Sequence, residues 1–432
     1  MNDDLSPARA AAGYVLSRCR RFDSWSQQTL NAARAKFKLS DRDAALCERL
    51  CLTVLQNAAL CDFYIGAYSS VPTAQMEPRV LDALRLGTAQ LLMMDRIPAS
   101  AAVDQSVAMA KRANRSTAGL VNAVLRHIAE NKASLPEIPE KGTARELSVR
   151  YSHPLWFCEK LLVEHGYEFA RAVLEANNTP PTLTVSANLQ RADAVQLAKA
   201  LTSRGLRAKV HPLSEVSVEI LDRGAVDTLP GFADGAFFVQ DAAAARSVLA
   251  AKPQKGSRVL DLCAAPGGKG LLCASLMGNE GEIVSCDLHE KKLRLIEENV
   301  RRTALDCISV RQMDASEPDE AYYNAFDLVI ADVPCSGFGV IRKKPEIRYK
   351  DPESLKGLPE VQKRILRGAA RCVRPGGTLL YSTCTVFPEE NEFVVDSFLN
   401  EHENYEKLQI RTIWPQECNT DGFFYCVLKR NG

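Results

Sequence analysis

Residues 259–270 read VLDLCAAPGGKG, and this stretch decides the fold class. An apolar run typical of a buried strand leads into a turn, where Gly267 and Gly268 let the backbone bend sharply before a helix. Strand-like and helix-like segments then alternate to the end of the chain, with strands expected at RVLDLC, EIVSCD, CISVRQ, FDLVIADV and GTLLYST. This alternation predicts an α/β domain over residues 236–432, built on a parallel, doubly wound sheet. Ligands of such sheets bind at the carboxyl ends of the strands.

The turn sequence narrows the class of ligand. It matches neither GxGxxG nor GxxxxGK[ST], the loops that clamp dinucleotides and nucleoside triphosphates. The second strand ends in Asp287, a position that bonds ribose hydroxyls, and Asp314 follows the third strand within reach of an adenine amino group. Ribose and adenine contacts without a strong phosphate clamp suit S-adenosylmethionine better than NAD or ATP. Taken singly, each aspartate could instead cap a helix or a turn.

The residues before this domain divide into three parts. Residues 1–132 show apolar positions at helical spacing and no strand pattern, so an all-α domain is expected. Residues 133–145 contain prolines and a glycine without apolar periodicity, which indicates a linker. Residues 146–235 mix helix and strand patterns and predict a small α+β subdomain.

Composition gives mainly exclusions. The chain has 432 residues, a formal net charge of +1 and 14 cysteines without a CxxC pair. No export signal and no apolar run of membrane-spanning length is seen, so we expect reduced thiols, a cytoplasmic location and no membrane span. Cysteines and histidines are not clustered at zinc spacing, so no metal is expected. The parts are long enough to bury their own faces, and a monomer is expected.

Two cysteines follow predicted strands. Residues 332–336 read DVPCS and residues 381–385 read YSTCT. A single cysteine in such a place is usually a small buried apolar side chain, but Asp-x-Pro and Ser-Thr beside this pair favour chemistry. Methylating C5 of cytosine needs a thiolate that adds to C6 and a base that later removes the C5 proton. Two cysteines and a carboxylate around one ring would serve that reaction.

The motifs LDLCAAPGGK, ADVPCSGFGVIRKKPEIR and YSTCTVFPEENE together resemble the RNA cytosine-C5 methyltransferase family, over about residues 146–432. The leading helical region resembles the NusB-like RNA-binding domain. That combination is typical of bacterial enzymes that modify small-subunit rRNA. The resemblance implies a Rossmann-like, class I S-adenosylmethionine-dependent methyltransferase domain, preceded by an all-α NusB-like domain and a small RRM-like α+β RNA-binding subdomain.

The resemblance also implies roles for individual residues. Cys384 is expected to be the nucleophile, Cys335 the residue needed for release, and Asp332 the cytosine contact beside the methyl donor. The cofactor site is expected to comprise Cys263, Ala264, Ala265, Pro266, Gly267, Gly268, Lys269, Asp287 on ribose, Asp314 near adenine, and Asp332. Gln240 and Asp241 match a segment near the methionine tail, although Asp241 could instead cap the following helix. Gly270 departs from the threonine usual in the family, which we expect to cost only a hydroxyl.

Basic residues follow the first cysteine motif. Arg342, Lys343, Lys344 and Arg348 are expected to hold RNA phosphates near a base that has left its stack. The helical domain and residues 146–235 would then select the RNA by shape.

The leading hypothesis is methylation of C5 of a cytosine in 16S rRNA, free or in early assembly, with S-adenosylmethionine as donor. The same chemistry on tRNA or on another rRNA cytosine is the alternative within the class. A non-catalytic RNA-binding or assembly factor is a distant alternative, because both cysteines and all three aspartates are present. An amino-methyltransferase is disfavoured, since such enzymes carry Asn/Asp-Pro-Pro-Tyr/Phe where this chain has Asp-Val-Pro-Cys.

Overall fold

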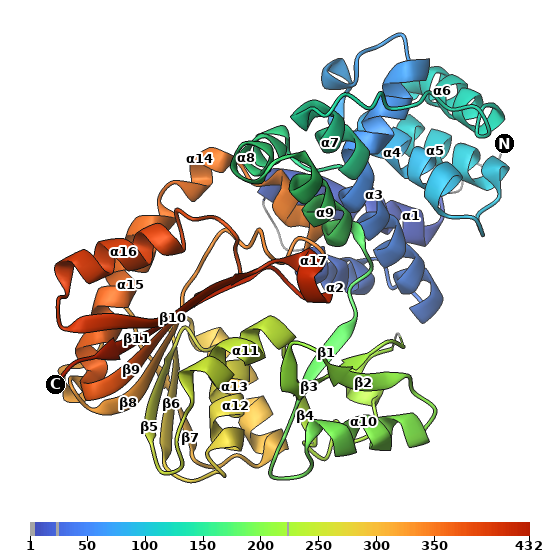
Figure 1. The fold of residues 1–432 in the computed structure, drawn as a ribbon. Helices are drawn as coiled ribbons and strands as arrows, with labels where there is room; N and C mark the ends of the chain where they lie inside the picture. The colour runs from blue at the N-terminus through green and yellow to red at the C-terminus, as the bar shows by residue number, and fades with distance from the viewer. Residues whose placement is uncertain (1–4, 23–25, 223) are drawn as a thin grey trace. The chain divides into compact units, whose positions relative to one another are not determined.

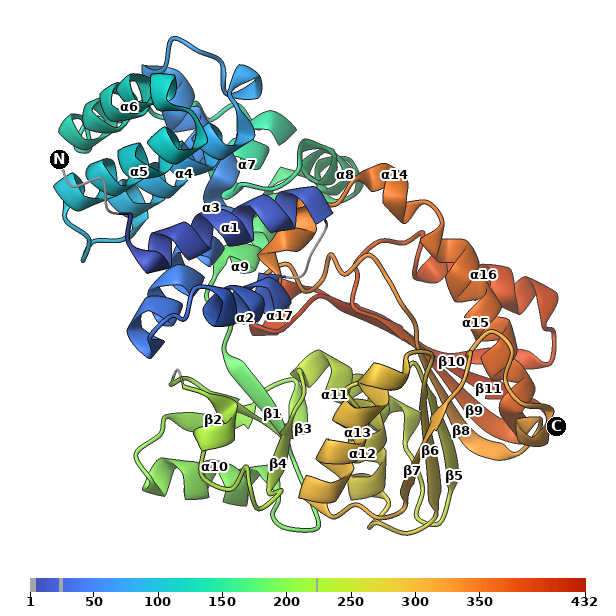
Figure 2. The same ribbon diagram turned by 180° about the vertical axis from the view of Figure 1, so that it is seen from behind.

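The computed structural model describes residues 5–22, 26–222 and 224–432 (Figures 1 and 2). It divides into two compact units. The helical unit comprises Met1–Thr179 together with the short segment Lys343–Lys350. The catalytic-motif unit comprises Pro180–Arg342 and Asp351–Gly432. The chain therefore passes from one unit to the other at three peptide bonds, two of which flank the 343–350 segment.

The described part of the helical unit is built from α-helices joined by short connections. They are α1 (Pro7–Phe22), α2 (Ser26–Lys36), α3 (Asp41–Tyr68), α4 (Pro78–Met93), α5 (Ala99–Ala113), α6 (Ala118–Glu130), α7 (Ala144–Tyr151), α8 (Leu155–His165) and α9 (Tyr167–Asn178). Short 3₁₀ helices cover Thr73–Gln75, Arg115–Thr117 and Pro345–Tyr349. Apolar side chains from α1 to α6 form one continuous core, as the helical spacing of residues 1–132 predicts.

The helix α3 lies at the centre of this core. Ser40 caps its first turn by accepting a hydrogen bond from the Asp43 N–H. By length and composition alone, α3 is the one helix in the described ranges that could cross a membrane. It contributes Cys47, Leu50 and other side chains to the core between α1, α4 and α6. The long apolar stretch of α3 is thus accounted for by packing inside the bundle.

A kink at Asn57 interrupts α3, and a residue far along the chain compensates for it. Asn57 has non-helical dihedral angles, so the usual bond from the Leu60 N–H to the Gln56 carbonyl is replaced. The Leu60 N–H instead donates to Ser152 Oγ at 3.0 Å. The Gln56 carbonyl instead accepts from Arg348 Nη1 at 2.7 Å. Both backbone groups freed by the kink are therefore paired.

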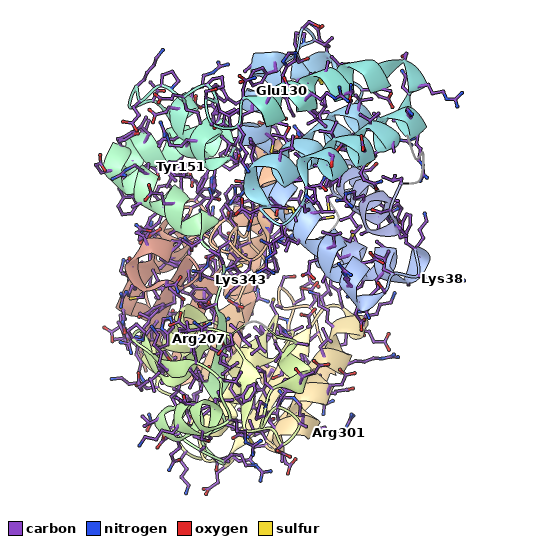
Figure 3. The ribbon with its side chains drawn as sticks, turned by 90° about the vertical axis from the view of Figure 1, so that its right-hand side faces the viewer. Lys38, Glu130, Tyr151, Arg207, Arg301 and Lys343 are labelled. Atoms are coloured by element: carbon purple, nitrogen blue, oxygen red, sulfur yellow. The ribbon has the colours of Figure 1, made fainter. Side chains whose placement is uncertain are left out.

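Arg348 also closes the ends of two further helices. Its guanidinium donates to five amide oxygens, those of Gln56, Tyr151, Ser152, Asn177 and the Asn178 side chain. Tyr151 ends α7 and Asn178 ends α9, so the cation sits at the negative ends of two helix dipoles. Tyr151 and Lys343, the first residue of the segment that carries Arg348, are labelled in Figure 3. Burial lowers the pKa of Arg348 to about 10, which leaves it charged at neutral pH.

The second unit begins with a small antiparallel sheet. Its strands are β1 (Leu183–Ala187), β2 (Ala208–His211), β3 (Ser214–Ile220) and β4 (Phe237–Val239), in the order β2-β3-β1-β4. The helix α10 (Ala194–Ser203) packs on one face through Leu197 and Leu201. From the same sheet, Val216 and Phe238 join the core of the larger sheet. The small sheet is thus fixed to the larger one by shared apolar side chains.

The larger sheet has seven strands in the order β10-β11-β9-β8-β5-β6-β7. They are β5 (Arg258–Leu262), β6 (Glu282–Asp287), β7 (Ile308–Gln312), β8 (Phe326–Asp332), β9 (Val373–Thr383), β10 (Tyr405–Ile413) and β11 (Phe423–Arg430). The first five in sequence are parallel, and β11 runs antiparallel between β9 and β10. The order reverses at β5, whose carboxyl end is the place where such sheets bind ligands.

Helices cover both faces of this sheet (Figures 1 and 2). They are α11 (Ala242–Ala251), α12 (Gly268–Leu276), α13 (Glu290–Thr303), α15 (Leu358–Cys372) and α16 (Glu392–Glu401). Two short helices, α14 (Pro352–Leu355) and α17 (Pro415–Cys418), lie in connections between these elements. Along β8, Leu328 and Ile330 pack with α11 and α12, while Val329 and Ala331 pack with α15 and α16. This alternation follows from the two-residue period of a strand and explains why β8 is apolar throughout.

The predicted fold class is confirmed, with two differences in detail. The C-terminal strands β10 and β11 form an antiparallel hairpin. The sequence does not predict β10, because its many polar side chains obscure the apolar pattern of a strand. Residues 146–235, predicted as one subdomain, are shared between the units, since α7 to α9 pack with the helical unit and β1 to β3 with the other. The division changes within this stretch, at Thr179, because Arg348 ties the ends of α7 and α9 to α3.

We predict that replacing Arg348 with methionine loosens the helical unit. Five amide oxygens at the helix ends lose the guanidinium donor, although the Tyr151 carbonyl keeps a bond from Asn178 Nδ2. We expect this loss to cost about 2–4 kcal/mol. Hydrogen exchange of the full chain, followed by mass spectrometry, should show faster exchange in α7 and α9. Peptides from β5 and β8 should exchange as in the unchanged chain.

The matched control is Arg42→Met, which removes an exposed arginine of the same unit. A surface change of this kind is expected to alter stability by less than about 0.5 kcal/mol. Equal exchange in the Arg348 and Arg42 variants would show that the buried guanidinium does not stabilise the helix ends.

Candidate functional site

Neighbouring strands bring the two cysteine motifs together. β8 and β9 are parallel neighbours, with Asp332 opposite Ser382. Cys335 lies three residues beyond the end of β8, and Cys384 comes directly after β9. The two cysteines, 49 residues apart in sequence, therefore meet at one edge of the sheet.

The two sulfur atoms are in direct contact. Cys335 Sγ and Cys384 Sγ lie 3.2 Å apart, and both side chains are partly exposed. The pKa of Cys335 is raised well above its ordinary value by the hydrogen bond to Cys384, by burial of its sulfur and by the charge of Glu390. Either sulfur atom can be the donor in this contact, and the raised pKa of Cys335 favours the protonated form of its own thiol.

Asp332 lies at the end of β8 and is fixed by two side chains. Ser382 Oγ donates to Asp332 Oδ1 at 2.7 Å, and Lys269 Nζ pairs with Oδ2 at 2.7 Å. Lys269 itself is buried in the first turn of α12, with its ammonium group 5.2 Å from the centre of the Phe423 ring. One carboxylate at the end of β8 is thus linked to both β9 and α12.

The glycine turn after β5 has the shape that its sequence predicts. Gly267 has φ +104°, a conformation that favours glycine. A Cβ atom on Gly270 would lie 2.7 Å from Ser285 Oγ and 3.1 Å from Asp261 Oδ2. Glycine in place of the threonine expected from the resemblance therefore costs more than a hydroxyl group. The Ser285 hydroxyl occupies the space that a side chain at position 270 would need.

A cavity of about 160 Å³ opens at this turn. It is lined by Val239, Gln240, Asp241, Ala244, Asp261, Cys263, Ala264, Ala265, Pro266, Gly268, Lys269 and Asp332. The buried Gln240 accepts from Ser186 Oγ at 2.8 Å, while its Nε2 has no partner. Asp261 Oδ1 also has no partner. Buried polar atoms are normally paired, so two unpaired ones at a cavity mark a place for a polar ligand.

Asp261 belongs to the site but is not among the residues predicted from sequence. It lies on β5 within the quoted LDLC motif and is fully buried, with Oδ2 accepting from the Gly270 N–H at 2.9 Å. Burial raises its pKa to about 7, opposed by Lys269 and reinforced by Asp332. Its position in an apolar strand pattern was the available signal, because an acid is costly there without a function.

Asp287 and Asp314 are placed differently. The buried Asp287 ends β6, where its Oδ1 accepts from the His289 N–H at 3.1 Å and pairs with Lys292 at 3.5 Å. The exposed Asp314 accepts from the N–H and the hydroxyl of Ser316, which lowers the pKa of Asp314. Asp314 therefore caps a turn, which is the alternative to an adenine contact that its sequence position allows. Asp241 likewise caps α11 by accepting from the Ala243 N–H at 2.9 Å, while it also lines the cavity.

The basic residues after the first cysteine motif separate into two kinds. Arg342 is buried in the catalytic-motif unit and donates to both the side chain and the carbonyl of Asn419. Arg348 is buried among helix ends in the helical unit. Lys343 is partly exposed and Lys344 is exposed. Both guanidinium groups are buried and bind protein atoms, which does not suit the phosphate contacts predicted for Arg342 and Arg348.

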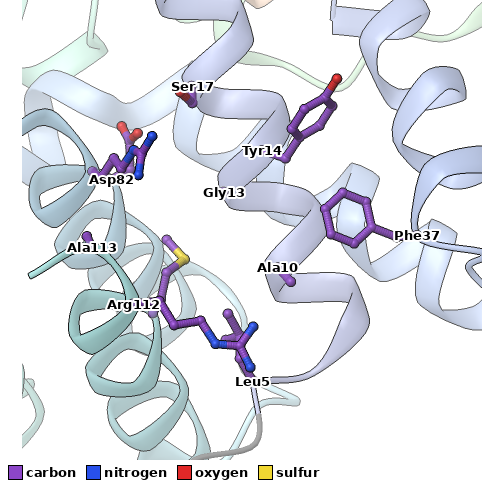
Figure 4. A pocket seen from close by; sticks show the side chains of 11 residues that line it. Leu5, Ala10, Gly13, Tyr14, Ser17, Phe37, Asp82, Arg112 and Ala113 are labelled. Atoms are coloured by element: carbon purple, nitrogen blue, oxygen red, sulfur yellow. The ribbon is translucent and has the colours of Figure 1, made fainter.

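A second cavity, of about 320 Å³, lies within the helical unit (Figure 4). Tyr14 and Phe37 line one side, and Asp82 and Arg112 another. Asp82 is bonded to Arg20 at 2.6 Å. None of the residues predicted from the motifs lines this cavity, whereas the cavity at β5 is lined by Asp332 and by residues of the glycine turn.

The sheet is doubly wound, with a glycine turn and a cavity at its switch point and an acid, Asp287, at the end of β6. This arrangement is that of an S-adenosylmethionine-dependent methyltransferase fold. Family models agree along the chain. Residues 248–429 match the 16S rRNA methyltransferase RsmB/F model, residues 6–130 match the NusB family, and residues 153–227 match the ferredoxin-like domain of RsmF/B-like methyltransferases.

Full-length relatives extend this result. A Bacillus subtilis protein named probable ribosomal RNA small subunit methyltransferase B is 34% identical, over 97% of this chain and 97% of its own length. The ribosomal RNA small subunit methyltransferase B of Erwinia tasmaniensis is 31% identical over 91% of this chain and 92% of its own length. The chain belongs to this RsmB/F methyltransferase family. The crystal structure of PH0851, at 24% identity, has the same fold over 99% of both chains with a TM-score of 0.80.

We predict that Asp261 makes stability depend on pH. Between its ordinary pKa of 3.8 and about 7, the folded chain keeps a proton that the unfolded chain has lost. The free energy of unfolding therefore falls as pH rises through this range, by about 2 kcal/mol between roughly pH 5.5 and pH 7. Asp261→Asn should remove this contribution and flatten the pH dependence of thermal unfolding.

Asp306→Asn, at an exposed position, is the control and should leave the pH dependence unchanged. An unaltered slope in Asp261→Asn would mean that the carboxyl titrates equally in the folded and unfolded chain.

Proposed function

We propose that the protein methylates C5 of a cytosine in 16S rRNA, with S-adenosylmethionine as methyl donor, through a covalent bond between Cys384 and C6. The observation that carries the proposal is the contact of two cysteine sulfur atoms, 3.2 Å apart, beside a carboxylate at the ends of β8 and β9. Transfer to an exocyclic amine would need no thiolate. The rRNA named for the family's members supports the choice of substrate.

In this proposal Cys384 is the nucleophile. C5 of cytosine is a weak nucleophile until a thiolate adds to C6 and makes C5 enamine-like. The raised pKa of Cys335 supports the assignment, because the thiol that keeps its proton is the one that can stabilise a neighbouring thiolate. After methyl transfer, the C5 proton leaves and the bond from Cys384 to C6 breaks. Cys335 is proposed to serve this release step as base, in the thiolate form that it takes once its own proton has passed to solvent. It accepts the C5 proton, and the electron pair of that C–H bond re-forms the C5–C6 double bond as Cys384 leaves as a thiolate.

Asp332 is proposed to contact the cytosine ring. It lies on the strand whose loop carries Cys335, and Ser382 fixes its orientation. The Lys269 ammonium group, 2.7 Å away, balances its charge in a partly buried place. Charge that develops on the ring during addition would meet this ion pair rather than bulk water.

The cofactor supplies an activated methyl group, and the lining of the small cavity fits it. Asp261 and Gln240 present an unpaired carboxylate oxygen and an unpaired amide nitrogen, which match the amino and carboxyl groups of a methionine tail. Residues 263–269 are proposed to form the turn against the cofactor. Asp287 is proposed to hold its ribose and Asp314 to lie near its adenine.

RNA binding is proposed to use Lys343 and Lys344 for phosphate contacts, with the helical unit and the small sheet selecting the RNA by shape. A monomer acting on free or early-assembly 16S rRNA is the simplest form of the proposal.

The first test of the chemistry is capture of the adduct. Cys335→Ala should accumulate a protein–RNA complex that survives denaturation, because the bond from Cys384 forms and release is blocked. Cys384→Ala should give no such complex. Sequencing the captured RNA identifies the substrate, and a tRNA or another rRNA cytosine would replace the 16S assignment. If neither variant forms an adduct while it binds the cofactor, the chain is a non-catalytic RNA-binding factor.

A second test concerns the two lysines. Replacing Lys343 and Lys344 together with glutamine should weaken RNA binding and flatten the dependence of log K on log salt by about 1.4, or roughly 0.7 for each lost contact to single-stranded RNA. The Lys255→Gln and Lys291→Gln pair, at exposed positions elsewhere, is the charge-matched control. An unchanged slope in the first pair would exclude phosphate contacts at these residues.

A further inference from the structure

Two side chains outside the cysteine motif hold the peptide groups on either side of Cys335. Gln362 Nε2 donates to the Pro334 carbonyl at 3.0 Å. The Ser336 N–H donates to Glu390 Oε2 at 2.8 Å. Gln362 comes from α15 and Glu390 from the loop between β9 and α16. We call these two residues the Gln362–Glu390 clamp.

The two residues of the clamp also bind each other. Gln362 Nε2 donates to Glu390 Oε2 at 2.8 Å, and both side chains are buried. The nitrogen of the amide must be the atom that faces the carboxylate and the Pro334 carbonyl, because both of these are acceptors. Buried charge-assisted bonds of this kind are short and directional, so they restrict how far the turn can move.

The clamp is itself fixed to the strand that carries the other cysteine. The Tyr381 hydroxyl donates to the Glu390 carbonyl at 2.6 Å, and Tyr381 is fully buried on β9, three residues before Cys384. The hydroxyls of Ser336 and Thr385, which follow the two cysteines, lie 2.8 Å apart. These bonds therefore fix the position of the Cys335 turn relative to β9.

Cys335 needs such support more than Cys384 does. Cys384 directly follows β9, a strand paired on both sides with β8 and β11. The turn around Cys335 lies beyond β8, where the Val333 N–H bonds to Ser382 and the Gly339 N–H to Cys384. Between those two points, the clamp bonds both peptide groups next to Cys335.

We infer that Gln362 and Glu390 are positioning residues for the release step, acting by holding Cys335 against the C5 proton. This inference rests on the proposed function, in which Cys384 attacks and Cys335 releases. Loss of the clamp would leave attack by Cys384 intact and slow release. The adduct that Cys335→Ala traps would then accumulate, to a lesser degree, in clamp variants that retain both cysteines.

The experiment measures two rates in the full chain with S-adenosylmethionine and the captured RNA. Single-turnover formation of the denaturation-resistant adduct reports attack, and steady-state methyl transfer reports release. Gln362→Met removes both donated bonds at nearly constant volume, and should lower turnover about tenfold or more while the trapped fraction rises severalfold. Adduct formation should stay within about twofold of the unchanged chain, since β9 holds Cys384.

Glu390→Gln keeps an oxygen for the Ser336 N–H but loses the charge, so a smaller rise in trapped adduct is expected. It also serves as the second variant if Gln362→Met melts well below the unchanged chain. Glu389→Gln, one residue away and exposed, is the matched control and should show neither effect.

The outcomes separate the inference from the proposed function. Equal losses of attack and turnover, without accumulation of adduct, would overturn the positioning role and leave only a structural one. Accumulation in Cys335→Ala but in neither clamp variant would overturn it as well, with the proposed function intact. Absence of adduct in Cys335→Ala would refute the proposed function itself.

Discussion

The parallel pairing of β8 with β9 is the constraint on which the rest of the site depends. It places Asp332 opposite Ser382, so that the carboxylate and the hydroxyl meet at 2.7 Å. The two chain segments that leave these strands then start side by side, and their cysteines come into contact. Side chains from α12 and α15 reach the same edge, because these helices cover the two faces of the sheet. A shift of one residue in this pairing would turn Ser382 to the other face and separate the two motifs.

Several buried polar groups lie at the carboxyl ends of the sheet strands. Asp261, Gln240 and Glu390 are all buried, and the first two have atoms without a partner. Each unpaired buried polar group costs about 1–3 kcal/mol, which the apolar cores on both faces of the sheet must offset. Glu390 differs, because two donors satisfy it. The unpaired groups line the cavity proposed for the cofactor, while the paired one supports the turn that holds Cys335.

Arg348 lies in a short segment that packs with one unit, while the residues on both sides of this segment pack with the other. The residues before and after 343–350 pack in the catalytic-motif unit. This segment nevertheless supplies Arg348, whose guanidinium binds oxygens at the kink of α3 and at the ends of α7 and α9. Read as sequence, Arg348 is one more basic residue after a cysteine motif. Its five acceptors come from three separate helices, and only the folded chain brings these together.

Sequence by itself determined the strand and helix alternation, the glycine turn, and the two cysteine motifs at strand ends, because each depends on local propensity and on a short apolar period. It also gave the helical character of the first part and the family resemblance. The tertiary structure alone decided the contact of Cys335 with Cys384 and the burial of Arg342 and Arg348 against protein atoms. It also decided the antiparallel placement of β11 between β9 and β10, and the contacts of Gln362 and Asp261. These depend on which distant segments become neighbours. The sequence shows that a polar residue lies in an apolar helix or strand, but it does not show which distant residue will be its partner.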